Sequence, residues 1–194
     1  QAFGFTTFFT LISIITVNII AFTLAYLLTR KIKGTNFFRT VFFMPNLIGG
    51  VVLGYIWQIL INGVLSVAGE PLLALNTTAG YWGLIILMCW QQVGYMMIIY
   101  IAGLQSVPES LIEAAKIDGA TSFQTLLKIK IPMIMQSVTI CVFLTLTNSF
   151  KLFDQNMALT NGEPMNTTTM LALNIYKTFY NRTGAQWKGL GQAK

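Results

Sequence analysis

Charged residues are scarce in this chain of 194 residues: Asp, Glu, Lys and Arg make up 9% of it, against 55% hydrophobic residues. Soluble globular domains carry roughly 25% charged residues, so the composition excludes an ordinary soluble domain. The few charges lie between apolar runs that are too long for strands or for ordinary core helices. Composition and spacing together predict a membrane protein.

Histidine is absent, and the two cysteines, Cys89 and Cys141, lie apart inside apolar runs. Without imidazoles and paired thiolates, no metal site is expected, and we predict no disulfide. The net charge of +6 does not indicate a nucleic-acid partner, because the Lys and Arg residues flank apolar segments. A nucleic-acid binder would gather them on one solvated face.

Two further absences concern the supply of energy. No G-x-x-x-x-G-K-[ST] phosphate-binding loop occurs, so the chain is not expected to bind ATP phosphates itself. We predict that it is not an enzyme and has no catalytic residue of its own. No Asp, Glu, Lys or Arg lies within the apolar runs, whereas carriers driven by protons or ions generally need one there. Active transport through this chain would therefore draw its energy from another protein.

Four apolar runs are long enough to cross a bilayer as helices, because about 20 apolar residues span its ~30 Å hydrocarbon core. The predicted spans cover residues 2–28, 41–61, 81–104 and 132–150. The expected fold is all-α, a polytopic transmembrane helical bundle in a single domain over residues 1–194.

Orientation follows from Lys and Arg in the short loops, because these residues are retained on the cytoplasmic side. The connection between the first two spans has four of them, the loop over residues 105–131 has three, and the connection between the second and third spans has none. The two basic connections are therefore expected to be cytoplasmic. The tail over residues 151–194 is also basic yet falls outside, which is acceptable because long segments translocate largely regardless of charge. Residues 170–180 of this tail are amphipathic enough for a short surface helix.

The cytoplasmic loop has the pattern of two short helices joined by a glycine. Ser106 and Glu109 form an S-x-x-E capping box, which predicts a first helix beginning near Val107. Gly119 fits the left-handed position just past the end of that helix. Thr121 or Ser122 is then expected to cap a second helix through residues 123–130, before Pro132 opens the fourth span.

The charges of this loop are balanced. Its three cations are matched by three carboxylates, Glu109, Glu113 and Asp118. A helix that lies on lipid headgroups usually shows a dominant basic face, so the balance favours a protein partner over the alternative of a lipid-surface helix.

A known pattern runs through the loop: E-A-A, three residues, G, nine residues, I-x-L-P. It is carried here by Glu113, Ala114, Ala115, Gly119, Ile129, Lys130, Ile131 and Pro132. This pattern resembles the EAA loop of binding-protein-dependent ABC importer permeases, with Ile131 in place of the usual Leu.

Two other segments are similar to the carbohydrate subfamily of these permeases. Residues 38–45 resemble its F-R-t-x-x-f-x-P entry to a span. Residues 153–169 resemble its F-D-x-x-x-x-L-T-x-G-G-P-x-x-x-T segment, with Glu163 in place of the second glycine. Members of the family usually have six spans, so the resemblance implies that this chain, with about four, is a fragment.

The resemblance implies a permease subunit of an ABC importer for a sugar or oligosaccharide, multi-pass in the bacterial plasma (inner) membrane. It implies as partners a cytoplasmic ABC ATPase dimer, a second permease subunit and an extracytoplasmic solute-binding protein, besides membrane lipid. ATP and magnesium would belong to the ATPase, with no cofactor in this chain. The residues expected to couple to the ATPase are Glu113, Ala114, Ala115, Asp118, Gly119, Ile129 and Pro132.

Amide and aromatic side chains within the spans suit a neutral polyol, because amides satisfy hydroxyl groups and rings lie against sugar faces. The candidates for the substrate pathway are Tyr55, Trp57, Gln58, Gln91, Gln92 and Asn148. Each of them has the alternative role of joining two helices or anchoring the membrane interface. Other functions also stay open: a nucleotide-independent facilitator or channel, an ABC permease for a non-sugar solute such as glycerol phosphate, and a membrane scaffold.

Overall fold

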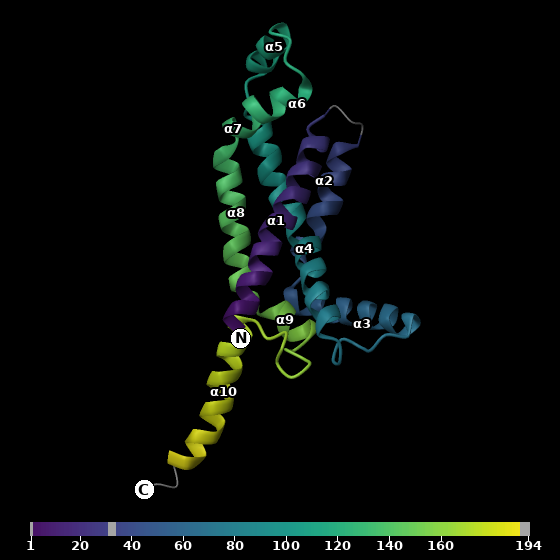
Figure 1. Ribbon diagram of the computed structural model, residues 1–194, viewed down its shortest axis with the longest axis vertical. Helices are drawn as coiled ribbons and strands as arrows, with labels where there is room; N and C mark the ends of the chain where they lie inside the picture. The colour runs from purple at the N-terminus through teal and green to yellow at the C-terminus, as the bar shows by residue number, and fades with distance from the viewer. Residues whose placement is uncertain (1, 31–33, 191–194) are drawn as a thin grey trace. The chain divides into compact units, whose positions relative to one another are not determined.

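The computed structural model describes residues 2–30 and 34–190, and it describes side chains as far as residue 180. Throughout these residues the regular secondary structure is helical, as the predicted all-α class requires (Figure 1). The chain divides into two compact units, which we describe separately. The loop unit comprises the described residues of segments 12–48 and 88–146, and the junction unit those of segments 1–11, 49–87 and 147–194.

Two long apolar helices agree closely with the predicted spans. Helix α1 (Ala2–Leu28) has the predicted bounds, and α4 (Thr77–Gln105) begins four residues before the predicted third span. The earlier start has a local cause, because the Asn76 side-chain oxygen accepts a hydrogen bond from the Ala79 N–H at 3.0 Å and so caps the first turn. Both helices are long and apolar enough to cross a membrane.

The prediction of one continuous span over residues 41–61 is wrong. The chain instead forms α2 (Thr35–Phe43), a 3-10 turn η1 (Met44–Leu47) and then α3 (Gly50–Ala68). Pro45 removes a backbone donor near the end of α2, and an extended Ile48 with ψ of 131° breaks the helix before α3. Helix α3 is apolar enough to span a membrane. It runs on to Ala68, which shortens the predicted loop before α4.

The fourth predicted span, residues 132–150, also needs correction. Short helices α6 (Ser122–Thr125), η2 (Leu126–Lys130, a π-helix) and α7 (Ile131–Met133) precede α8 (Met135–Phe150), and a bend of 70° separates the segment Ser122–Met133 from α8. Pro132 therefore lies in α7, before the bend, and does not open α8. The run qualifies as a fourth span only if both sides of the bend count together.

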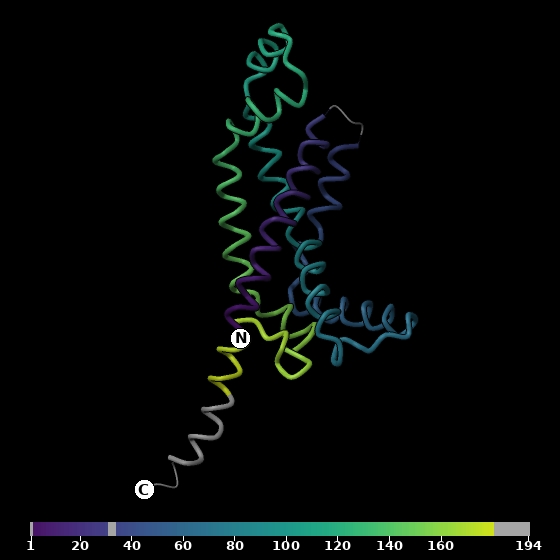
Figure 2. Tube along the Cα trace, in the orientation of Figure 1, coloured from purple at the N-terminus to yellow at the C-terminus, as the bar shows by residue number. Residues whose placement is uncertain are grey.

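The tail contains two helices. Helix α9 (Asp154–Leu159) was not predicted, and α10 (Leu171–Leu190) begins within one residue of the predicted surface helix but continues past residue 180. Figure 2 shows the chain leaving α9 in a loop that returns to the start of α10.

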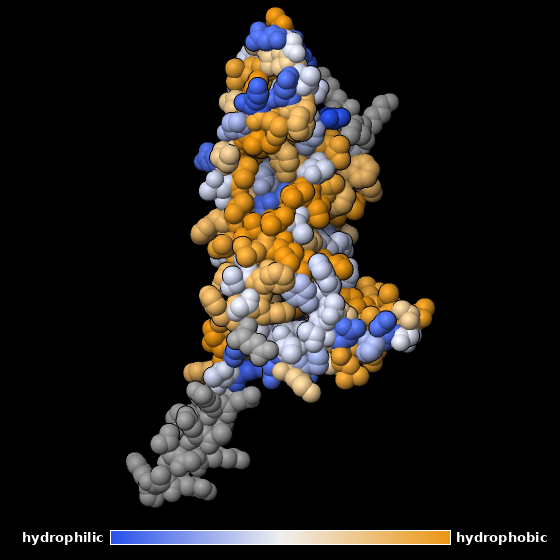
Figure 3. Space-filling model, in the orientation of Figure 1, coloured by the Kyte–Doolittle hydropathy of each residue, from blue (hydrophilic) through white to orange (hydrophobic). Residues whose placement is uncertain are grey.

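The loop unit has an apolar core between α1, α4 and α8. Its fully buried members include Val17, Ala21, Met96, Met97 and Cys141. Two consecutive side-chain hydrogen bonds cross this core. The Tyr100 hydroxyl donates to the Asn18 side-chain oxygen at 2.7 Å, and the Asn18 amide donates to the Thr145 hydroxyl at 3.3 Å. Satisfied polar groups of this kind hold helices in one register inside an apolar medium. On the face that Figure 3 shows, the surface over these helices is largely apolar.

Candidate coupling loop

The first helix of the loop, α5 (Glu109–Ile117), begins two residues later than predicted. The predicted capping box is wrong, because the Ser106 hydroxyl donates to the Gly103 carbonyl at 2.7 Å and so completes α4 instead of capping α5. Pro108 occupies the N-cap position, with ψ of 132°. A proline disfavours the helical conformation in the residue before it, which keeps Val107 out of the helix. The extended ψ of Pro108 itself then makes Glu109 the first helical residue.

The end of α5 agrees with the sequence. Gly119 has φ of +75°, the left-handed conformation that was predicted for it. The Ala120 N–H donates to the Ala115 carbonyl at 2.9 Å, which closes the last turn in the manner of a Schellman motif. A Cβ added at Gly119 would meet no atom within 4 Å, so backbone conformation and not crowding favours glycine here.

Helix α6 follows directly and is capped by Thr121. The Thr121 hydroxyl accepts from the Gln124 N–H at 3.3 Å, and the Gln124 side chain accepts from the Thr121 N–H at 2.8 Å. This reciprocal pair is a capping box. Of the two predicted caps, the structure thus has Thr121, although only four residues are α-helical before the π-helix η2 begins.

A hollow of about 530 Å³ lies between α5 and the α6–η2 segment. Five of the seven predicted coupling residues line it: Ala114, Ala115, Asp118, Gly119 and Ile129. Glu113, exposed on α5, and Pro132, in α7, do not. The fold thus gathers most of the predicted loop residues around one concave surface.

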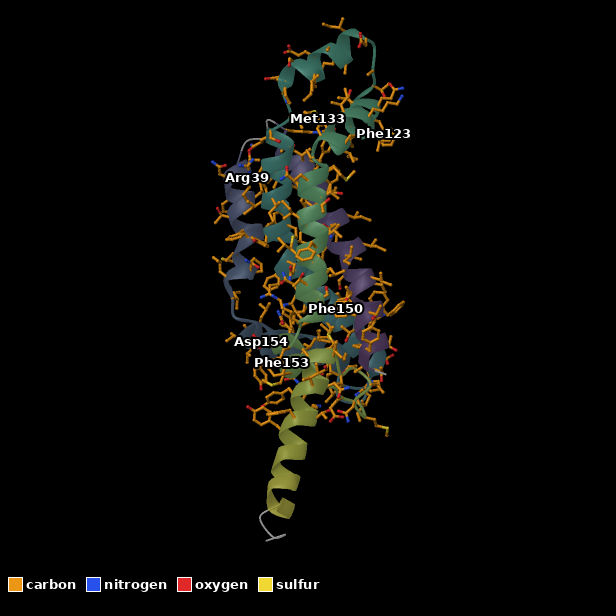
Figure 4. The ribbon with its side chains drawn as sticks, turned by 90° about the vertical axis from the view of Figure 1, so that its left-hand side faces the viewer. Arg39, Phe123, Met133, Phe150, Phe153 and Asp154 are labelled. Carbon is orange, nitrogen blue, oxygen red and sulfur yellow. The ribbon has the colours of Figure 1, made fainter. Side chains whose placement is uncertain are left out.

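Large apolar side chains project from the same loop, and they were missed from the sequence. Ile117 is 87% exposed and Phe123 is 68% exposed. Figure 4 shows Phe123 at the outer edge of this region, and Figure 3 shows that hydrophilic residues gather over α5 and α6. These two apolar side chains stand exposed among the charged residues of the loop. The signal in the sequence was their position next to the E-A-A and glycine positions.

The six substrate-pathway candidates are divided between the two units. Tyr55, Trp57, Gln58 and Asn148 belong to the junction unit, and Gln91 and Gln92 belong to the loop unit. The Gln58 amide donates to the Leu159 carbonyl at 3.1 Å, and the Gln91 amide donates to the Ile48 carbonyl at 3.2 Å. Both carbonyls lie at helix ends. The two amides therefore supply hydrogen bonds to backbone carbonyls at the places where the helices end.

A packing motif in the junction unit was also missed. Gly50 and Gly54 form a G-x-x-x-G pair on α3, which lies against α9. A Cβ at Gly54 would lie 2.6 Å from the Cβ of Ala158, and one at Gly50 would lie 2.9 Å from the Cβ of Asp154. Glycines at this spacing let two helices approach closely, and the spacing within an apolar run was the available signal.

Asn156 organises the segment after α9. Its side chain is fully buried, its amide donates to the Thr168 carbonyl at 2.8 Å, and its oxygen accepts from the Met170 N–H at 2.9 Å. In the following turn φ is positive at Asn161 and Gly162 but not at Glu163. The position where the resemblance leads us to expect a second glycine therefore accepts a glutamate here without strain in φ.

Comparison with known proteins gives a consistent result. Residues 33–188 match the family described as "Binding-protein-dependent transport system inner membrane component". The chain is 47% identical over 197 residues to the probable starch degradation products transport system permease protein AmyD of Thermoanaerobacterium thermosulfurigenes, covering 98% of this chain and 66% of that protein. It is 35% identical to the multiple sugar-binding transport system permease protein MsmF of Streptococcus mutans, covering 91% of this chain and 63% of that protein. The chain thus spans less than two thirds of the length of either relative.

Solved structures share the fold. A chain of a bacterial ABC transporter involved in the import of the acidic polysaccharide alginate matches with a TM-score of 0.79 and 21% identity, over 96% of this chain and 68% of that one. The same kind of transporter in complex with an alginate pentasaccharide-bound periplasmic protein matches with a TM-score of 0.74 and 20% identity, over 96% and 67%.

Proposed function

The chain belongs to the family of binding-protein-dependent transport system inner membrane components, and from this premise we propose that it forms part of the pathway of a sugar ABC importer. The observation that carries the coupling role is the loop from α5 to α7. There a helix, a left-handed glycine and a capped helix surround one hollow, with Ile117 and Phe123 exposed beside it.

The loop is suited to transmit movement from a separate ATPase. Its turn is closed by local hydrogen bonds, so that α5 and α6 can move together as one element. A ligand or partner shifts a conformational equilibrium only by contacting the two states differently. We infer that the hollow and the exposed apolar side chains provide this contact, with Ala114 and Ala115 allowing close approach and Glu113 offering a polar contact at the exposed face.

The remaining partners follow from the same premise. We infer an ABC ATPase dimer on the cytoplasmic side, a second permease subunit and an extracytoplasmic solute-binding protein. The substrate class rests on the relatives, which are named for starch degradation products and for multiple sugars. A relative named for sn-glycerol-3-phosphate is 31% identical over 168 residues, so a glycerol phosphate substrate is the weaker second candidate.

The test is ATP-dependent uptake by the full-length protein, reconstituted in proteoliposomes with its ATPase and binding protein. Starch-derived oligosaccharides and glycerol phosphate are offered separately. We expect oligosaccharide uptake that requires ATP. Uptake of oligosaccharide without nucleotide would instead establish a facilitator, and uptake of glycerol phosphate alone would overturn the sugar assignment.

Coupling is tested in the same system with Ile117→Ser, Phe123→Ser and Glu113→Ala. We expect each to weaken retention of the ATPase and to lower uptake, with the larger loss for the two apolar positions. The matched control is Glu70→Ala, an exposed carboxylate in the loop before α4 that the charge distribution places on the opposite side of the membrane. Normal ATPase retention and uptake in all three loop variants would refute the docking role.

A further inference from the structure

Two cations lie close to one tyrosine ring in the loop unit. The guanidinium carbon of Arg30 is 4.9 Å from the centroid of the Tyr26 ring, and the Lys130 ammonium is 5.3 Å from it. The Arg30 guanidinium also donates to the Tyr26 hydroxyl at 3.3 Å. Tyr26 belongs to the last turn of α1, and Lys130 ends η2, just before the bend that leads to α8. The ring therefore lies where two apolar helices meet the charged loop.

Beside this ring lies a pocket of about 190 Å³. Its lining consists of Tyr26, Ile112, Lys116, Ala120, Ser122, Thr125 and Lys130. Two lysines and a serine are thus among the residues that line the pocket, and no acidic residue is. This is the donor set that recognises a phosphate group.

The charged residues of the loop are distributed unevenly between its two hollows. Asp118 and Lys128 line the larger hollow between α5 and η2, whereas Lys116 and Lys130 line the small pocket. Glu109 and Glu113 line neither. The small pocket is therefore lined by two lysines and by no carboxylate, within a loop whose overall charge is balanced.

We propose that this pocket binds the phosphate headgroup of an anionic membrane phospholipid. A lipid headgroup and a free phosphate ion present the same phosphate group to the lysines, but the surroundings of the pocket favour a lipid. Leu27, on the last turn of α1, is 43% exposed, and Met133 and Met135, on either side of the bend before α8, are 47% and 51% exposed. Acyl chains can lie against these side chains while the headgroup contacts the lysines. Basic pockets between membrane helices on the cytoplasmic side bind anionic headgroups in this way.

The inference rests on the membrane placement of α1 and α8 and on the cytoplasmic side proposed for the loop, and it is independent of the transported solute. It assigns Lys116 and Lys130 to lipid, and leaves the larger hollow to the ATPase. A lipid held between α1 and the loop would link the position of the loop to the membrane surface.

Native mass spectrometry of the full-length protein, purified in detergent, tests the proposal. Phosphatidylglycerol and phosphatidylcholine with the same acyl chains are titrated in separate arms, and inorganic phosphate is added in excess in a third arm. We expect preferential binding of phosphatidylglycerol. A basic residue near an anionic surface contributes enough to change affinity about fivefold, so each of Lys116→Gln and Lys130→Gln should weaken phosphatidylglycerol binding by about that factor.

The matched control is Lys128→Gln, a lysine of the same loop that lines the other hollow. It should bind phosphatidylglycerol as the wild type does. Equal binding of the two lipids, or equal losses in Lys128→Gln and Lys130→Gln, would overturn the proposal. Displacement of phosphatidylglycerol by inorganic phosphate would replace the lipid with a free anion as the ligand. ATPase retention is measured on the same variants. Because we expect Lys116→Gln and Lys130→Gln to retain the ATPase, a failure of the lipid proposal can be distinguished from a failure of the coupling role.

Discussion

The turn between α5 and α6 and the junction between α3 and α9 both depend on glycine, but for different physical reasons. At Gly119, φ is +75° and an added Cβ would meet nothing within 4 Å. At Gly54, inside a regular helix, an added Cβ would lie 2.6 Å from the Cβ of Ala158. Gly119 meets a conformational requirement that its own backbone sets. Gly54 meets a packing requirement that a distant segment of the chain sets.

The hydrogen bonds of the two regions follow the same division. The turn is closed by the bond from Ala120 to Ala115 and by the reciprocal pair of Thr121 and Gln124, all within a few residues. The junction is joined by the Gln58 amide, which donates to the Leu159 carbonyl far along the chain. A locally closed turn can move as one piece and keep its shape, whereas a junction held by distant partners resists separation of its helices. This contrast fits the coupling role that we propose for the loop.

The largest expected effect comes from Gly54→Val. The added side chain forces α3 and α9 apart, and overpacking of this kind lowers the free energy of unfolding by about 3 kcal/mol. The measurement is the melting temperature of the purified full-length protein in detergent, with protein yield recorded as well. Gly54→Ala should show a smaller loss, which Ala158→Gly should partly restore in the double variant because the two Cβ atoms then no longer collide.

The control for this prediction is Gly63→Ala in the same helix, where an added Cβ meets nothing within 4 Å. Alanine is preferred to glycine within a helix by roughly 0.5–1 kcal/mol, so this variant should be unchanged or slightly more stable. If Gly54→Val melted at the same temperature as Gly63→Ala, the close contact between α3 and α9 would be refuted.

A smaller effect, with a different signature, is expected from Gly119→Val. A β-branched residue in the left-handed conformation is destabilised by roughly 1–2 kcal/mol, and no neighbour is displaced. The turn should open locally, so amide hydrogen exchange rises between residues 115 and 124 while the melting temperature changes little. Asparagine tolerates this conformation, so Gly119→Asn should exchange nearly as the wild type does. Equal exchange in the valine and asparagine variants would show that φ at this position does not matter.

The same contrast explains what could be predicted from the sequence. The left-handed Gly119 was predicted correctly, and Thr121 was one of the two predicted caps, because both depend on neighbours within a few residues. The long apolar run of α1 was predicted with its correct bounds for the same reason. The S-x-x-E box failed although it is local, because the Ser106 hydroxyl has a competing acceptor in the last turn of α4.

Features set by distant partners were not predicted. The close packing of Gly54 on Ala158 depends on a segment whose position no local pattern reveals. The pocket beside Tyr26 joins residues of α1 and of the loop, so counting charges along the loop could not show that two lysines and no carboxylate line it. The break at Ile48 was missed because an apolar run gives the same hydropathy whether or not it bends.

The smallest expected effect is that of Thr121→Ala, which removes the hydroxyl that accepts from the Gln124 N–H. Loss of an N-cap of this kind destabilises a helix by about 1 kcal/mol. Helix α6 has only four residues, so few other interactions within it can offset this loss. The Gln124 amide should then exchange several-fold faster, while Thr121→Ser, which keeps the hydroxyl, should leave its exchange unchanged. Because α6 carries Phe123, a frayed α6 should also weaken ATPase retention slightly in the alanine variant alone. Faster exchange without that loss would mean that the position of Phe123 does not depend on the cap, and that the partner orders this helix on binding.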